Sequence, residues 1–178
     1  MIAHSYYGDA MKKIILFLFC LTVILVLTNS KEELLIPDQS IRYRIIANSN
    51  SKEDQTTKWT INKELIPILH NITTDATSYE DSQNLIKQEL PRINNILSKY
   101  TNDFKVNFGN NYFPEKIYHK VKYNAGEYES LVISLGESKG DNWWCVLFPP
   151  LCLLEANAND TDEVQYDWYI RNIIKKYS

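Results

Sequence analysis

Beyond the first forty residues, the side chains best suited to covalent chemistry are two cysteines and two histidines, His70 and His119. A thiol-dependent hydrolase would use Cys145 or Cys152 as its thiolate and His119 as the base, with Asp141 available to orient the imidazole. The two cysteines are also close enough in sequence to pair with each other in an oxidising compartment. A disulfide is the simpler interpretation, while separate thiols and a nucleophilic thiol stay open.

Motifs for metals and nucleotides do not accompany these residues. The sequence contains no C-x-x-C, no H-E-x-x-H and no D-x-D-x-D-G loop, and residues 136–140 lack the G-K-[ST] ending of a phosphate loop. Glu127 and Glu129 are interpreted as a solvated strand face. The net charge is −3 without a long basic run, which argues against nucleic acid as a partner. We therefore expect no catalytic residue, metal, cofactor or small-molecule substrate.

The most unusual stretch is Gly140–Cys152, which combines adjacent tryptophans, two cysteines and two prolines. In a strand, Trp143 and Trp144 point to opposite faces of the sheet. One of them can enter the core, whereas the other must meet solvent, a helix or a partner. Tryptophan is enriched among binding hot spots, so an interface anchor is one interpretation and two packed tryptophans are the other.

The beginning of the chain has the layout of an export signal. Lys12 and Lys13 precede an uncharged, largely apolar run at residues 14–28. Fifteen helical residues reach about 22 Å, less than the roughly 30 Å hydrocarbon core of a bilayer. We therefore favour a cleaved signal within residues 1–30 and keep a retained membrane anchor as the alternative.

Apolar periodicity predicts the elements that carry these residues. Strands are expected at 41–47, 104–108, 116–123 and 128–135, with a turn at 109–111, and residues 143–148 are a candidate for a last strand. S-x-x-D signals at Ser51 and Ser78 each begin a predicted amphipathic helix, and Pro67 and Pro91 should kink or bend these helices. A short amphipathic helix is expected within residues 164–177.

The predicted order, β-α-α-β-β-β, indicates an α+β fold in which a helix pair covers an antiparallel or mixed sheet. The 178 residues are interpreted as one small domain preceded by the signal or anchor segment. The expected divisions are residues 1–30, an extracytoplasmic domain at 31–155 and a C-terminal tail at 156–178.

Two separated blocks resemble one known family, that of stage II sporulation protein R. The Gly140–Cys152 stretch is similar to the family's C-terminal signature. The similarity extends back through three shorter segments, Phe113-Pro114, Ala125–Glu129 and Leu135–Glu137. Ile41–Gln55 resembles the N-terminal motif, although Lys52 stands where a proline commonly opens the helix.

This resemblance implies a secreted intercellular signalling protein of sporulation. It would be exported from the forespore into the space between forespore and mother cell, and would activate a membrane-embedded aspartic protease there. That protease removes the pro-segment of sigma-E in the mother cell. The protein itself would then be a ligand rather than an enzyme.

The residues expected to contact the protease are Asp141, Asn142, Trp143 and Trp144. The turn from Asn48 to Asp54 is expected to form a second patch. Two alternatives remain: a secreted thiol-dependent hydrolase that uses Cys145 or Cys152, and a membrane-anchored interaction protein that retains residues 14–28.

Overall fold

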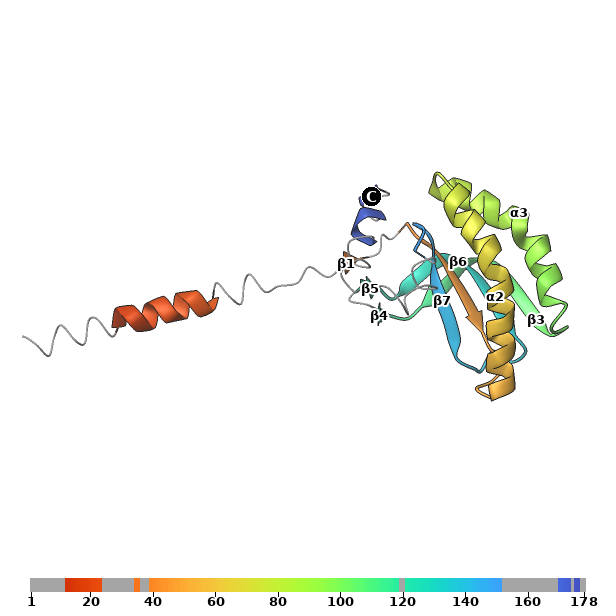
Figure 1. Ribbon diagram of the computed structural model, residues 1–178, viewed down its shortest axis with the longest axis horizontal. Coiled ribbons are helices and arrows are strands. Elements are labelled where there is room, and N and C mark those ends of the chain that lie inside the picture. The colour runs from red at the N-terminus through yellow and green to blue at the C-terminus, as the bar shows by residue number, and fades with distance from the viewer. Residues whose placement is uncertain are drawn as a thin grey trace, which may run out of the picture. The chain divides into compact units, whose positions relative to one another are not determined.

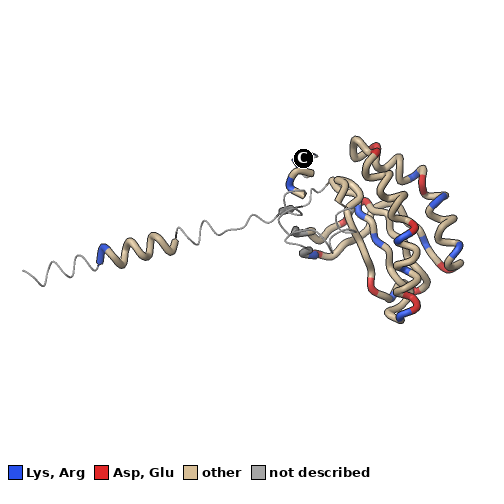
Figure 2. Tube along the Cα trace, viewed as in Figure 1, with Lys and Arg blue, Asp and Glu red and all other residues tan. Residues whose placement is uncertain are grey.

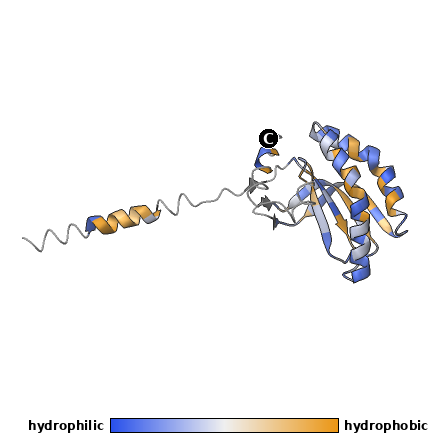
Figure 3. Cartoon of the chain, in the orientation of Figure 1, coloured by the Kyte–Doolittle hydropathy of each residue, from blue (hydrophilic) through white to orange (hydrophobic). Residues whose placement is uncertain are grey.

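The computed structural model describes residues 12–23, 34–35, 39–118, 121–151, 170–173 and 175–176. The chain divides into two compact units, Met1–Glu33 and Leu34–Ser178. In the first unit, residues 12–23 form an exposed helix that is apolar beyond its two lysines (Figure 3). No helix in the described ranges is both long and apolar enough to span a membrane. The other residues of the predicted signal segment lie outside the described residues.

The second unit is built on a four-stranded mixed sheet with the order β3-β6-β2-β7. Its strands are β2 (Ile41–Ile46), β3 (Phe104–Phe113), β6 (Gly126–Leu135) and β7 (Asn142–Phe148). β2 runs parallel to β6 and antiparallel to β7, and β3 runs antiparallel to β6. A smaller sheet has the order β1-β5-β4, formed by Leu34–Leu35, Val121–Tyr123 and Lys116–Tyr118.

Two helices, α2 (Lys52–Asp75) and α3 (Tyr79–Leu97), lie side by side over one face of the large sheet (Figure 1). Each begins where the sequence predicts, because the hydroxyls of Ser51 and Ser78 accept hydrogen bonds from the backbone three residues later. α2 continues without a break through Pro67, which is exposed on the solvent side of the helix.

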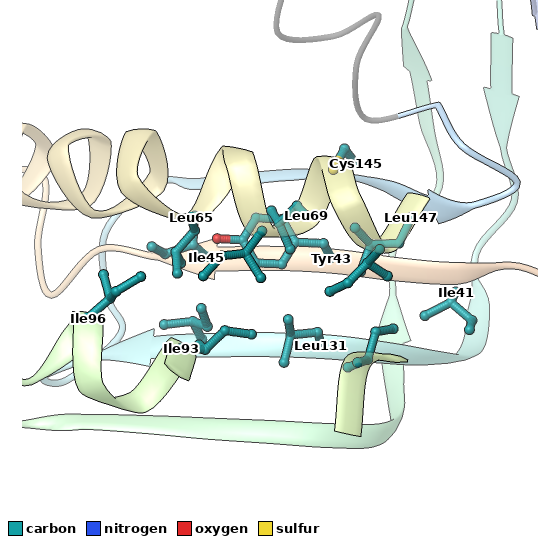
Figure 4. Packing of buried hydrophobic residues seen from close by; sticks show 14 of the residues in the cluster. Ile41, Tyr43, Ile45, Leu65, Leu69, Ile93, Ile96, Leu131, Cys145 and Leu147 are labelled. Atoms are coloured by element: carbon teal, nitrogen blue, oxygen red, sulfur yellow. The ribbon is translucent and has the colours of Figure 1, made fainter. Parts of the chain in front are cut away.

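The main core lies between the helices and this sheet face, as Figure 4 shows. Alternate residues of β2, among them Tyr43 and Ile45, are fully buried against apolar side chains of both helices such as Leu65 and Ile93. The hydroxyl of Tyr43 donates a 3.1 Å hydrogen bond to Asn62 Oδ1 on α2, so this buried polar pair is satisfied.

The opposite face of the sheet carries a second cluster that is rich in aromatic residues. Arg42 is fully buried there, with its guanidinium carbon 3.3 Å from the ring centroid of Tyr128. Trp144 packs at 5.0 Å from Tyr123 and 5.6 Å from Phe113, measured between ring centroids. Ile170 also belongs to this cluster, so the described part of the C-terminal segment contributes to the packing of the unit.

The structure confirms an α+β fold with a mixed sheet and a helix pair. The order of elements along the chain differs from the predicted β-α-α-β-β-β. Gly109–Asn111, expected as a turn, lies inside β3 because β6 offers ten consecutive pairing partners that override the local turn preference. The single strand expected at 116–123 is instead the antiparallel pair β4 and β5. β1 was not predicted, and most of the predicted helix at 164–177 lies outside the described residues.

Candidate partner-binding site

One end of the large sheet brings together two loops that lie about ninety positions apart in the sequence. The loop between β2 and α2 holds Asn48–Ser51, and the loop between β6 and β7 holds Gly136–Asp141. The backbone N–H of Asp141 donates to Asn50 Oδ1 at 2.6 Å, and that of Lys139 donates to the carbonyl of Asn48 at 3.0 Å. The two sequence blocks that resemble one family therefore contact each other through these loops.

Asp54 organises the first of these loops. Its carboxylate accepts hydrogen bonds from the hydroxyl of Ser49 and, at 3.0 Å, from the side-chain amide of Asn48. These bonds, led by the one from Ser49, lower the pKa of Asp54 below its ordinary value. A carboxylate held ionised in this way suits a fixed structural or recognition role better than proton transfer at neutral pH.

Two glycines permit the close approach of the loops. A Cβ atom on Gly140 would lie 2.2 Å from the backbone oxygen of Ser49, and one on Gly136 would lie 2.2 Å from Oδ1 of Asn48. Gly136 also has a φ of +52°, in the left-handed region that glycine tolerates best. Both positions need a residue without a side chain.

Lys58, on α2, holds the β6–β7 loop against that helix. Its ammonium donates to the carbonyl oxygen of Asp141 at 3.0 Å and to Gln55 Oε1 at 2.7 Å, and the residue is only 2% exposed. Burial lowers the pKa of Lys58, whereas the nearby Asp141 opposes that change. The backbone at Asp141 is therefore held by a cation on one side and by Asn50 on the other.

The adjacent tryptophans point to opposite faces of the sheet, as expected. Trp143 is half-buried on the helix side, with its ring 5.8 Å from that of Tyr43 and 6.3 Å from that of Trp59. Trp144 is 8% exposed within the aromatic cluster on the other face, so it offers little surface to a partner. Trp59, on α2, is 48% exposed and continues the surface that Trp143 begins.

A depression of about 260 Å³ lies next to these loops. Its lining includes three acidic residues, Glu53, Asp54 and Asp103, together with the side chain of Tyr100. Among the described residues, no cluster of three or more histidine, cysteine or acidic side chains is arranged to hold a metal ion. Acidic and polar groups thus dominate this part of the surface, and Figure 2 shows charges of both signs along the two helices.

The residues proposed for thiol chemistry are not brought together by the described part of the chain. Cys145 is fully buried in the main core, which gives a substrate no access to its sulfur. His70 is exposed on α2, and His119 and Cys152 lie outside the described residues. The predicted pairing of Cys145 with Cys152 therefore stays a prediction.

The predicted contacts Asn48, Asp54, Asp141 and Trp143 lie on or beside these loops, and their role in binding stays a prediction. Sequence reasoning did not single out three residues that support them, which are Lys58, Trp59 and Asn50, the last of which lies inside the predicted turn. Asn50 and Lys58 act through partners more than eighty positions away, and no local pattern reveals such pairings. A signal did exist for Trp59, because this aromatic residue falls off the apolar stripe of its own helix.

The structure defines a small α+β domain with two paired loops at one end of its large sheet. Comparison with known proteins then identifies the family. Residues 37–158 match the family model described as Stage II sporulation protein R. The chain belongs to the stage II sporulation protein R family, and this membership supports a role in sporulation.

One relative is Stage II sporulation protein R of Bacillus subtilis (strain 168), which is 38% identical over 145 residues. The aligned region covers 78% of this chain and 65% of the relative, so slightly less than two thirds of the relative's length is matched. No solved structure is significantly similar to the chain.

Proposed function

We propose that this protein is a secreted signal of sporulation that activates a membrane-embedded aspartic protease and thereby triggers processing of pro-sigma-E in the mother cell. The observation that carries the proposal is the contact between the Asn48–Asp54 and Asp141–Trp143 segments, in which the N–H of Asp141 donates to Asn50 and its carbonyl oxygen accepts from Lys58 on α2. Family membership supplies the sporulation context. Export from the forespore to the space between the two cells is part of the same proposal.

The proposed signal is a ligand whose binding surface is ordered before it meets its partner. A ligand shifts a conformational equilibrium only if it binds one state more tightly than the other. Loops that hydrogen bonds already hold in place lose little conformational freedom on binding, so more of the contact energy is available for that preference. The candidate contacts are Asn48, Asp54, Asp141, Asn142 and Trp143, while Trp144 acts mainly through packing.

Co-expression of the protease and pro-sigma-E with and without the full chain tests this function. We expect processing only when the chain is present, and we expect Asp141→Ala and Trp143→Ala to reduce it while the protein still folds. A third strain that carries a protease without its catalytic aspartate controls for cleavage by the chain itself. Processing at the same level in the absence of the chain would refute the proposal.

A further inference from the structure

One face of α2 carries a row of exposed side chains that do not pack in the core. Lys52, Thr56, Trp59, Lys63 and Pro67 recur at helical spacing and are all exposed; we call these five residues the α2 stripe. The side chains of Thr56, Trp59, Lys63 and Thr60 line an open hollow on this face. This hollow continues the surface of Trp143, because Trp59 lies edge-on to that ring.

The α2 stripe combines an apolar centre with a cationic rim. The hydroxyl of Thr56 donates to the carbonyl oxygen of Lys52 at 2.7 Å, and that of Thr60 donates to the carbonyl oxygen of Thr56 at 2.9 Å. Both hydroxyl donors are therefore already used within the helix. Trp59 is the one aromatic residue of the stripe and is 48% exposed, and both charged members of the stripe are lysines. A complementary surface would present an apolar side chain between carboxylates.

Trp59 is also held in place before any partner arrives. The buried ammonium of Lys58 lies 5.1 Å from its ring centroid, and Trp143 packs against it from β7. An aromatic side chain that is fixed yet 48% exposed loses little rotamer freedom on binding. These are the properties of a binding hot spot, and Trp59 has them more fully than Trp144.

We infer that the α2 stripe is the docking surface for an extracytoplasmic segment of the partner protease that carries an apolar side chain flanked by aspartate or glutamate. This inference rests on the proposed function, because it names the part of the ligand that the protease contacts. Trp59 fills the apolar contact, and Lys63 and Lys52 pair with the carboxylates.

A photo-crosslinking experiment in the co-expressing strain tests the inference directly. Benzoylphenylalanine replaces Trp59 in one full-length variant and Tyr112 in another; Tyr112 is 58% exposed on β3 and serves as the matched control. We expect a crosslink to the protease from position 59 and none from position 112. Pro-sigma-E processing by the wild-type chain is followed in the same cells.

Charge variants provide a second readout that does not depend on packing at Trp59. Lys63→Glu should lower processing at limiting protein by about tenfold or more, and Lys63→Gln should lower it less. Lys87→Glu, at an exposed position of α3, should leave processing unchanged. Thermal unfolding of each variant confirms that the fold persists.

The outcomes separate the two proposals. If processing needs the chain but position 59 gives no crosslink and Lys63→Glu is fully active, the docking surface is wrong and the signalling function stands. If the wild-type chain does not trigger processing and the position-59 variant does not crosslink to the protease, both proposals fail.

Discussion

Asp54 shows how a single residue can hold the loop between β2 and α2. Its carboxylate accepts side-chain hydrogen bonds from Ser49 and Asn48, while its own N–H donates to the hydroxyl of Ser51, the N-cap residue of α2. The lowered pKa that results means that the loop is stabilised whenever the carboxylate is ionised. The loop should therefore keep its shape throughout the neutral range of pH.

Asp54→Asn tests this arrangement through its pH dependence. Because the pKa is lower in the folded protein, the stabilisation is present above the unfolded pKa of about 3.9 and is lost as the pH falls through the folded value. We expect the variant to have a lower free energy of unfolding at pH 7 and a smaller difference from wild type near pH 3. Urea titrations at both pH values measure this; an equal difference at the two would contradict the account.

Arg42 is a buried cation whose surroundings are mainly aromatic. Its ring contacts are Tyr128, Phe113 and Trp144, and its Nε and Nη1 atoms have no hydrogen-bond partner among the described residues. Burial removes the guanidinium from water and thereby lowers its pKa. Packing, rather than an ion pair between described residues, is therefore its main contribution to the cluster.

Two substitutions at Arg42 separate packing from charge. Arg42→Ala should lower the free energy of unfolding by about 3 kcal/mol because it opens a cavity in the aromatic cluster. Arg42→Met fills much of that space without a charge and should cost about 1 kcal/mol. If chemical denaturation shows equal losses for both, the charge itself is essential and the packing explanation fails.

The cysteine pair has a simple chemical readout. If Cys145 and Cys152 are bonded, the denatured full-length chain should react with a thiol reagent only at Cys20, which is free. Reduction should then lower the free energy of unfolding by about 2.5 kcal/mol on the chain-entropy estimate. Three reactive thiols before reduction would show that the bond does not form.

At the scale of elements, the site depends on the contact between the β2–α2 and β6–β7 loops. The N–H of Gly140 donates to the carbonyl of Ala47 at 3.0 Å, and the N–H of Asp141 donates to Asn50 beside it, so the two loops are aligned by both bonds. The four residues that meet here are Ala47, Asn50, Gly140 and Asp141. They lie in two loops that are far apart in the sequence, so the order of the elements along the chain does not predict their contact. The register of β2 with β7 places them together.

Gly140→Ala tests the loop contact. Its new Cβ would meet the backbone oxygen of Ser49 at 2.2 Å, so the loops must separate and we expect a loss of about 2 kcal/mol together with weaker activation. Gly109→Ala is the matched control, since a Cβ there meets no atom within 4 Å. Thermal and urea unfolding measure both variants, and equal effects would show that the close approach is unimportant.

Local pattern was sufficient for elements whose signals are local. The hydroxyl caps at Ser51 and Ser78 and the alternation in β2 correctly predicted both helices and a central strand. Pattern was insufficient where a distant partner decides the outcome. β3 passes through Gly109–Asn111 because β6 pairs along its whole length, and Trp59 becomes part of the site only because β7 brings Trp143 to it.

At the scale of the whole molecule, the proposed function requires that the folded body acts outside the cytoplasm. The two units carry what this requires, which is a basic and apolar N-terminal helix in one and the candidate binding surface in the other. The same surface would be of no use to the protease if the body remained in the cytosol. Export and activation must therefore be lost together.

The most direct test is the fraction of pro-sigma-E that is processed when export alone is changed. Leu16→Arg together with Leu18→Arg places charges in the N-terminal helix and should block export while leaving the second unit intact. We predict processing with the exported chain and none with the export-blocked chain at the same cellular level. Equal processing by a chain confined to the cytosol would contradict the account.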